Sequence, residues 1–196
     1  MTTGFNRREI LQAGLAGFAG IVPLSLFAAD AHASTFQVNS SPTDICKISF
    51  HNQHTGESFN GAYRVGHKYI PDAFEQINTV LRDFRTHEIF PIDPRAIDIL
   101  YMINRKSSAR NSFEVLSGYR SPKTNEMLRR VGHGVAKNSL HLTGQAIDIR
   151  VPGYSTRRLH DVAIDLHAGG VGYYPVSNFV HIDTGKVRSW QWSQPS

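Results

Sequence analysis

Cysteine is almost absent from this chain: Cys46 is the single one among 196 residues. A lone cysteine excludes an intrachain disulfide framework, so the fold must be stabilised by an ordinary hydrophobic core. We expect Cys46 to lie on a strand as a small buried apolar residue. Residues 42–45 lack the apolar and small side chains that precede a lipoprotein cysteine, so we do not interpret Cys46 as a lipid attachment site.

Long hydrophobic runs are also scarce. The apolar stretch at residues 13–29 is about 17 residues long, the lower limit for crossing a bilayer. It follows the twin-arginine pair Arg7-Arg8 and precedes the small-x-small sequence at 31–33. These features predict that residues 1–33 are a signal for twin-arginine export to the periplasm and are then removed. The alternative is a membrane anchor that stays attached.

The rest of the chain has the size of one domain. Residues 34–44 are polar and lack periodicity, which is typical of a linker or arm. Residues 45–196 are long enough for one domain with one hydrophobic core. We expect no stable membrane span once the signal is removed.

Acidic residues are fewer than basic ones: the chain has 16 Asp and Glu and 21 Lys and Arg, which gives a net charge of +5. A basic exported protein suits anionic partners such as cell-wall polymers or phospholipid head groups. The alternative is that the charge serves solubility alone. Export and the lack of a basic-aromatic motif argue against nucleic acid as a partner.

The hydrophobic periodicity predicts an α+β fold, with helices packed around a small, mainly antiparallel sheet. Pro71 and Pro94 stand at the expected first positions of two helices, where a backbone N–H would have no partner within the helix and its absence costs nothing. The last two strands are expected to form an antiparallel pair. We expect helices at residues 71–84, 93–104, 121–131 and 155–167, and strands at 45–51, 57–63, 113–117, 145–151, 169–174 and 179–183.

Two histidines and two carboxylates carry the chemistry. His181 and Asp183 are two apart on an expected strand, so they share one face. Asp148 comes from another strand, and His141 comes from the loop before it, where Gly144 permits a turn. Three N/O ligands with an open fourth position are typical of a catalytic zinc. Taken singly each residue is more often structural, but together they predict that His141, Asp148 and His181 bind Zn²⁺.

A second element is the segment Ser117-Gly118-Tyr119-Arg120-Ser121. Arg120 follows an expected strand and precedes an expected helix, a place from which it can donate hydrogen bonds to a carboxylate or an oxyanion. The alternative is that Arg120 is a surface charge and that the serine only starts the helix.

These residues resemble the zinc D-Ala-D-Ala carboxypeptidase group, which also includes bacterial cell-wall endopeptidases and the hedgehog fold. The group's pattern His-x-x-Gly-x-Ala-x-Asp with a later His is matched by His141, Gly144, Ala146, Asp148 and His181. Its Ser-Gly-Tyr-Arg-Ser element is matched by the segment described above.

Within that group the chain resembles the murein endopeptidase K family. Residues 179–185 read Phe-Val-His-Ile-Asp-Thr-Gly, and residues 187–190 read Val-Arg-Ser-Trp. Both stretches follow the pattern of that family, and the resemblance extends over roughly residues 45–192, nearly all of the chain beyond the export signal.

The resemblance implies a hedgehog-like or D-Ala-D-Ala-peptidase-like fold and a Zn²⁺ cofactor. It implies that Arg120 holds the substrate carbonyl or carboxylate, with Tyr119 and Ser121 beside it at the substrate. The implied function is an exported zinc endopeptidase that hydrolyses peptide cross-links of peptidoglycan, including 3-3 links between two diaminopimelate residues. The alternatives are a non-catalytic zinc-containing wall-binding module and a D,D-carboxypeptidase.

One departure from the family pattern concerns the general base. The carboxypeptidase branch has Glu three residues before the last zinc histidine, where this chain has Asn178, and another branch has His where this chain has Phe179. Asp183 is the remaining candidate for the base. Asp183 is equally suited to a different role, in which it accepts the N–H of a metal-binding histidine and so orients the imidazole ring. His133, in the loop before the main motif, is a further histidine that the sequence does not place.

Overall fold

The computed structural model describes residues 41–107, 112–132 and 135–192. All of them belong to the compact unit Ala33–Ser196. The expected export signal, most of the expected arm and His133 lie outside the described residues.

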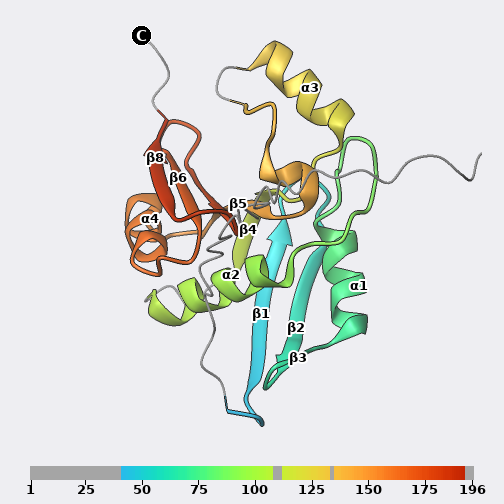
Figure 1. Cartoon of the computed structure of the whole chain (residues 1–196), viewed down its shortest axis with the longest axis vertical. Helices are drawn as coiled ribbons and strands as arrows, with labels where there is room; N and C mark the ends of the chain where they lie inside the picture. The colour runs from blue at the N-terminus through green and yellow to red at the C-terminus, as the bar shows by residue number, and fades with distance from the viewer. Residues whose placement is uncertain (1–40, 108–111, 133–134, 193–196) are drawn as a thin grey trace, which may run out of the picture. The chain divides into compact units, whose positions relative to one another are not determined.

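One mixed sheet forms the frame of the unit (Figure 1). Its strand order is β3-β2-β1-β4-β5-β7-β6-β8, in which β1 pairs in parallel with β4 and β6 with β8 while the other pairs are antiparallel. The strands are β1 Ile45–Asn52, β2 Ser58–Val65, β3 Lys68–Tyr69, β4 Phe113–Ser117, β5 Ala146–Arg150, β6 Gly170–Tyr174, β7 Phe179–Asp183 and β8 Arg188–Gln191.

The α+β class is confirmed, and so is the antiparallel pairing of β6 with β7. The expectation of a small, mainly antiparallel sheet is wrong, because the described sheet has eight strands and is mixed. The chain between β1 and β4 contains two helices, and a connection of that length allows the parallel pairing that a short turn does not. The short strands β3 and β8 were not expected.

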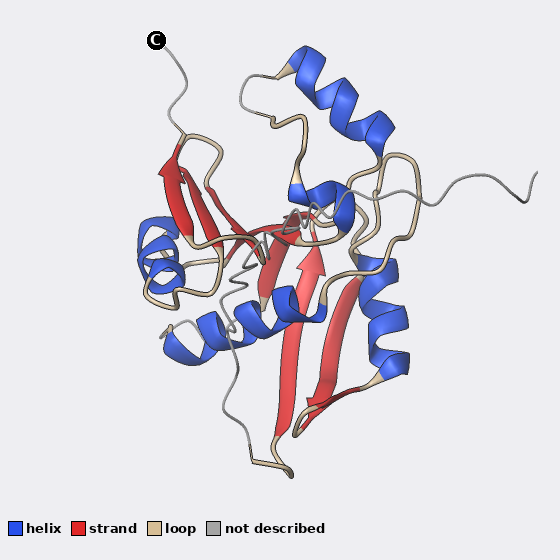
Figure 2. Ribbon diagram, in the orientation of Figure 1, coloured by secondary structure: helices blue, strands red, loops and turns tan. Residues whose placement is uncertain are grey.

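Four α-helices and one 3₁₀ helix lie within the described residues (Figure 2). Their starts agree with the sequence, because three begin with proline and the side chains of Asp93, Ser121 and Ser155 cap three of them. Two of them end earlier than expected. The helices are α1 Pro71–Val80, α2 Pro94–Lys106, α3 Pro122–Val131, η1 Leu140–Thr143 and α4 Thr156–Ile164.

The core lies between the sheet and helices α1, α2 and α4, while α3 lies apart from these helices near η1 (Figures 1 and 2). Ile147 and Ile149 of β5 and Ile182 of β7 belong to this core. Because side chains alternate along a strand, the intervening Asp148 and His181 emerge on the opposite face. The sheet thereby separates the apolar core from the candidate site.

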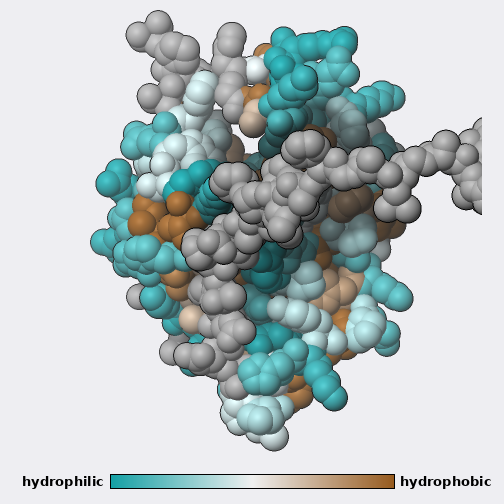
Figure 3. All heavy atoms as spheres, viewed as in Figure 1, coloured by the Kyte–Doolittle hydropathy of each residue, from teal (hydrophilic) through white to brown (hydrophobic). Residues whose placement is uncertain are grey.

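In the view of Figure 3, the described surface over α3 is mostly polar. Elsewhere in this view, apolar surface occurs in separate areas. Cys46 is buried as expected, at 1% exposure. Among residues 41–107, 112–132 and 135–192, none of the helices combines the length and apolarity needed to cross a bilayer.

A buried carboxylate joins α2 to β2 and β3. Asp98 accepts hydrogen bonds from the hydroxyls of Tyr63 (2.7 Å) and Tyr69 (2.6 Å). The Nε atom of Arg64 lies 3.1 Å from the same carboxylate, and both ionic side chains are at most 9% exposed. This cluster is therefore a polar link within the core, far from the candidate site in sequence and in the sheet.

Replacing Asp98 by alanine would remove the carboxylate that pairs with the buried Arg64 and accepts from Tyr63 and Tyr69. We expect Asp98→Ala to lower the free energy of unfolding by about 3–5 kcal/mol, the usual cost of removing one partner of a buried pair. Urea denaturation would measure this change. The control is Asp161→Ala on α4, whose ion pair with Arg157 is exposed and should contribute about 0.3–0.5 kcal/mol. Equal effects of the two substitutions would contradict the role given to Asp98.

Candidate metal centre

The three expected ligands meet at the centre of the sheet. Asp148 on β5 and His181 on β7 stand directly opposite each other in the antiparallel register. His141 lies in η1, which Ser139 caps, and Gly144 ends this turn with a left-handed φ of 64°. The turn returns the chain into β5, as the sequence predicted, and it carries the imidazole of His141 over Asp148.

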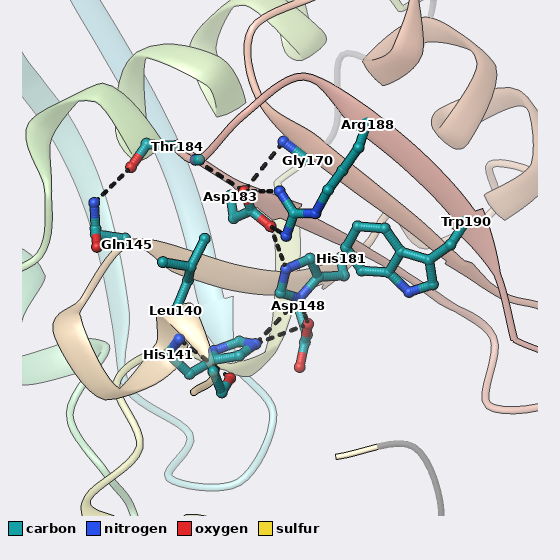
Figure 4. A network of polar contacts seen from close by, with 12 residues as sticks. Leu140, His141, Gln145, Asp148, Gly170, His181, Asp183, Thr184, Arg188 and Trp190 are labelled. Carbon is teal, nitrogen blue, oxygen red and sulfur yellow. Dashed lines mark hydrogen bonds and ion pairs between the residues drawn. The ribbon is translucent and has the colours of Figure 1, made fainter. Parts of the chain in front are cut away.

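The ligand atoms converge on one point (Figure 4). The Nε2 atom of His141 lies 3.2 Å from Asp148 Oδ1 and 3.2 Å from His181 Nδ1. His181 Nδ1 in turn lies 2.8 Å from Asp148 Oδ1. All three residues are buried.

Each imidazole has its other nitrogen occupied. His141 Nδ1 donates to the carbonyl oxygen of Gly118 at 2.7 Å, and His181 Nε2 donates to Asp183 Oδ2 at 3.0 Å. Because both acceptors lack protons to donate, these nitrogens carry the ring hydrogens. The lone pairs of His141 Nε2 and His181 Nδ1 therefore face Asp148.

Burial and charge set the protonation of the three groups. Burial lowers the pKa of His141 to about 4, so it is neutral near pH 7, the form that binds metals. Burial alone would raise the pKa of Asp148, but the charges and hydrogen bonds of His141 and His181 hold it well below its ordinary value. Burial also opposes the charging of His181, yet hydrogen bonds to Asp148 and Asp183 raise its pKa.

The donor set fits a divalent metal ion. Tetrahedral zinc with bonds of roughly 2.0–2.1 Å places its ligand atoms about 3.3 Å apart, and the observed separations of 2.8 to 3.2 Å are close to that spacing. Two nitrogens and one oxygen leave a fourth position open, as in catalytic zinc sites. Three electron-rich atoms so close together are stabilised by a proton or a metal ion between them.

Asp183 is completely buried and accepts five hydrogen bonds. Its Oδ1 accepts from the backbone N–H of Gly170 (3.1 Å) and Gly185 (2.9 Å) and from Arg188 Nη1 (3.0 Å). Its Oδ2 accepts from His181 Nε2 and from Arg188 Nη2 at 2.7 Å. Burial would raise the pKa of Asp183, but these donors, His181 and Arg188 above all, hold it well below its ordinary range.

Two glycines of β6 let side chains of β8 reach the site. Gly170 lies between Asp183 and Arg188 in the register, and Gly172 stands beside Trp190. A Cβ atom at Gly170 would lie 2.3 Å from Arg188 Nη1 and 2.5 Å from Asp183 Oδ2. A Cβ atom at Gly172 would lie 2.6 Å from the indole of Trp190. The space left by both glycines is thus occupied by Arg188 and Trp190.

The ligands line a cavity of about 600 Å³. The ring of Trp190 lies 5.2 Å from that of His181, and its Nε1 donates to the hydroxyl of Tyr174 at 3.1 Å. The open side of the metal centre therefore faces a space large enough for a peptide. Aromatic side chains form one wall, contributed by Tyr174, Phe179, Trp190 and Trp192, and apolar side chains beside α3, Leu128 and Val135, also line the space.

Arg120 faces the same cavity. Its Nη2 lies 3.2 Å from Asp148 Oδ2 and its Nε donates to Ser117 Oγ at 3.1 Å. Tyr119 instead packs its ring on Phe90, with centroids 4.8 Å apart. Ser121 is fully buried, caps α3, and donates its backbone N–H to Asp83. The structure thus brings Arg120 to the ligands, and neither Tyr119 nor Ser121 lines the cavity.

The sequence as a whole matches a known family. The M15_2 peptidase family, described as "Peptidoglycan L,D-endopeptidase MepK", matches residues 40–190. A protein of that description from Escherichia coli (strain K12) is 40% identical over 186 residues, which are 94% of this chain and 97% of the relative. The chain belongs to the MepK family.

Two further similarities were found. A probable MepK from Haemophilus influenzae is 41% identical over 145 residues, 74% of this chain and 78% of the relative. Among solved structures, the L-Ala D-Glu endopeptidase ChiX of Serratia marcescens aligns with a TM-score of 0.32 and 20% identity, over 39% of this chain and 62% of that chain. The resemblance to murein endopeptidase K is confirmed by the MepK family match and by the relatives' identity.

In this MepK family member, Asn178 points away from the metal centre. It has a positive φ of 53°, and its Oδ1 accepts a hydrogen bond from Thr156 Oγ1 at 3.0 Å. It lines a different hollow, beside the start of α4. The position that holds Glu in the carboxypeptidase branch is thus outside the cavity here.

Arg188 and Trp190 are site residues to which the sequence assigned no role, although both belong to the motif that carries the MepK family resemblance. The signal that could have found them is the Gly-x-Gly pattern of 170–172 in an expected strand. Alternate glycines on one face of a strand leave room for a neighbour's side chains to cross.

Filling that room should weaken metal binding. Gly170→Ala would push Arg188 away from Asp183 and loosen the partner of His181, so we expect metal affinity to fall about 10–100-fold. Titration of metal-free protein with Zn²⁺ measures this. Gly61→Ala on β2 is the control, since its Cβ would meet nothing closer than 3.6 Å. Unchanged affinity in Gly170→Ala would show that Arg188 does not support the centre.

Proposed function

We propose that this chain is an exported, zinc-dependent endopeptidase that hydrolyses peptide cross-links in peptidoglycan. The observation that carries the proposal is the open His141-Asp148-His181 centre on a peptide-sized cavity lined by Arg120. Relatives named as peptidoglycan L,D-endopeptidases support the substrate. The export signal proposed for residues 1–33 agrees with a substrate outside the cytoplasm.

Zinc bound by these residues would polarise the scissile carbonyl and lower the pKa of an attacking water toward about 7. Arg120 donates one N–H to Asp148 and one to Ser117. Its remaining N–H groups can donate to the oxygen of the substrate carbonyl. Removal of one such donor elsewhere costs roughly 2.7–4 kcal/mol of transition-state stabilisation. Tyr119 and Ser121 hold the Arg120 backbone in place.

Asp183 serves in this proposal to position His181. A general base needs a pKa near the working pH, whereas five donors hold the pKa of Asp183 well below its ordinary range. Its hydrogen bond to His181 Nε2 fixes the ring and its tautomer, the usual work of a carboxylate behind a metal-bound histidine.

The MepK relatives are described as L,D-endopeptidases, and this description supports a choice of bond. We propose that the enzyme cuts 3-3 links, in which the L-centre carbonyl of one diaminopimelate is joined to the D-centre nitrogen of the other. The position of Asn178 outside the cavity favours, as a second candidate, a wall-binding module that holds zinc without turnover.

Cross-linked muropeptides test the main proposal. We expect purified protein to split 3-3 dimers into monomers, to lose this activity in a chelator and to regain it with Zn²⁺, as chromatography with mass detection would show. Release of single D-Ala from a peptide that ends in D-Ala-D-Ala would indicate a D,D-carboxypeptidase instead. Wall binding with no hydrolysis after zinc loading would support the non-catalytic module.

The role of Asp183 has its own test. We expect Asp183→Asn to bind zinc about 10–100-fold more weakly but to recover most of its turnover at saturating zinc. The reason is that the asparagine oxygen can still accept from His181, while Arg188 loses its counter-charge. Turnover is measured against zinc concentration. A deep loss of kcat that persists in the fully zinc-loaded variant would instead identify Asp183 as the general base.

A further inference from the structure

The cavity contains one more arginine than its carboxylates can neutralise. Among the described residues that line it, the basic side chains outside the metal ligands are Arg85, Arg120 and Arg188, and the carboxylates are Asp148 and Asp183. Arg120 is paired with Asp148 and Arg188 with Asp183. No carboxylate of the described chain forms an ion pair with Arg85. A metal ion would add to this positive charge.

Arg85 is held in place despite being exposed. Its guanidinium lies over the ring of Phe84 at 4.1 Å, and Phe84 in turn stacks on His54 with ring centroids 4.0 Å apart. Such stacking fixes the plane of the guanidinium while its N–H groups stay available. A cation fixed in this way is suited to binding a planar anion.

The Arg85 loop is tied to the Arg120 segment. The buried Asp83 accepts from the backbone N–H of Arg85 at 2.9 Å and from that of Ser121 at 2.9 Å. Partial burial lowers the pKa of Arg85, the charge of Asp83 opposes this shift, and the charge of Arg120 adds to it. Two guanidinium groups facing one cavity repel each other, and an anion bound between them and the metal removes that repulsion.

We propose that Arg85 binds the free carboxylate of the substrate residue on the amine side of the scissile bond. This rests on the proposed function. In a link to the D-centre of diaminopimelate, the carbon that bears the scissile nitrogen also bears a free carboxylate. With the scissile carbonyl at the metal and Arg120, that carboxylate needs a separate cation, and a planar guanidinium can bind it through two parallel hydrogen bonds. The predicted substrate class is therefore peptides with a free carboxylate at that position.

The experiment compares two 3-3 muropeptide dimers that differ only in this carboxylate, which is free in one and amidated in the other. Both are given to zinc-loaded wild type, Arg85→Gln, Arg85→Lys and Arg82→Gln. Arg82 is the matched control, because it lies three residues away and its guanidinium pairs with Glu57 outside the cavity lining. Zinc content and thermal unfolding confirm that each variant is loaded and folded.

We expect wild type to prefer the free carboxylate. Arg85→Gln should lose about ten- to a hundredfold in kcat/KM on that substrate, mainly through KM, as for a lost charged hydrogen bond, and change little on the amidated one. Arg85→Lys should fall between the two, and Arg82→Gln should behave as wild type.

An Arg85→Gln variant that keeps the wild-type preference would overturn the role of Arg85 alone. Equal losses on both substrates would also overturn it, because they would indicate a general effect on the cavity. A zinc-loaded wild type that cleaves neither dimer would overturn the proposed function and this inference with it.

Discussion

Three electron-rich atoms aimed at one point are the constraint on which this structure depends. His141 Nε2, His181 Nδ1 and Asp148 Oδ1 lie within 3.2 Å of one another, an arrangement that is unfavourable unless a proton or a metal ion lies between them. Hydrogen bonds to Asp148 and Asp183 raise the pKa of His181 even though burial opposes this. The surroundings must therefore hold these groups together, and the carbonyl of Gly118, the carboxylate of Asp183 and the guanidinium of Arg120 do so.

The mixed sheet supplies those supports from distant parts of the chain. In one row across the strands Ser117, Asp148, His181, Gly172 and Trp190 are neighbours, running from β4 to β8. Strand β8 pairs in parallel with the edge of β6, so the side chains of Arg188 and Trp190 pass over Gly170 and Gly172. Asp148 and His181 are thus flanked on both sides within the sheet, and His141 reaches them from η1.

The sequence predicted which three side chains meet, because their signal is local. Alternation along a strand puts His181 on the face opposite Ile182 whatever the strand pairs with. What the sequence missed depends on distant contacts. Helix α1 ends at Val80, and just beyond it the Leu81 carbonyl accepts a hydrogen bond from the backbone of the distant Tyr119. The support from Arg188 likewise requires a register with β6 that no local pattern encodes.

The charges of the site are compatible with the proposal that one cavity holds both a metal ion and an anionic peptide. Asp148 and Asp183 each face an arginine, so their charge is largely neutralised before a substrate arrives. In a partly buried space such charges interact more strongly than in water, so an additional carboxylate would suffer little repulsion from these paired groups. Bound as proposed, it would meet instead Arg85, which forms no ion pair with a carboxylate among the described residues, and a metal ion held by the three ligands. The same ion pairs that position these side chains thereby leave the cavity positive, and the peptide proposed to bind there would balance this charge with a carboxylate of its own.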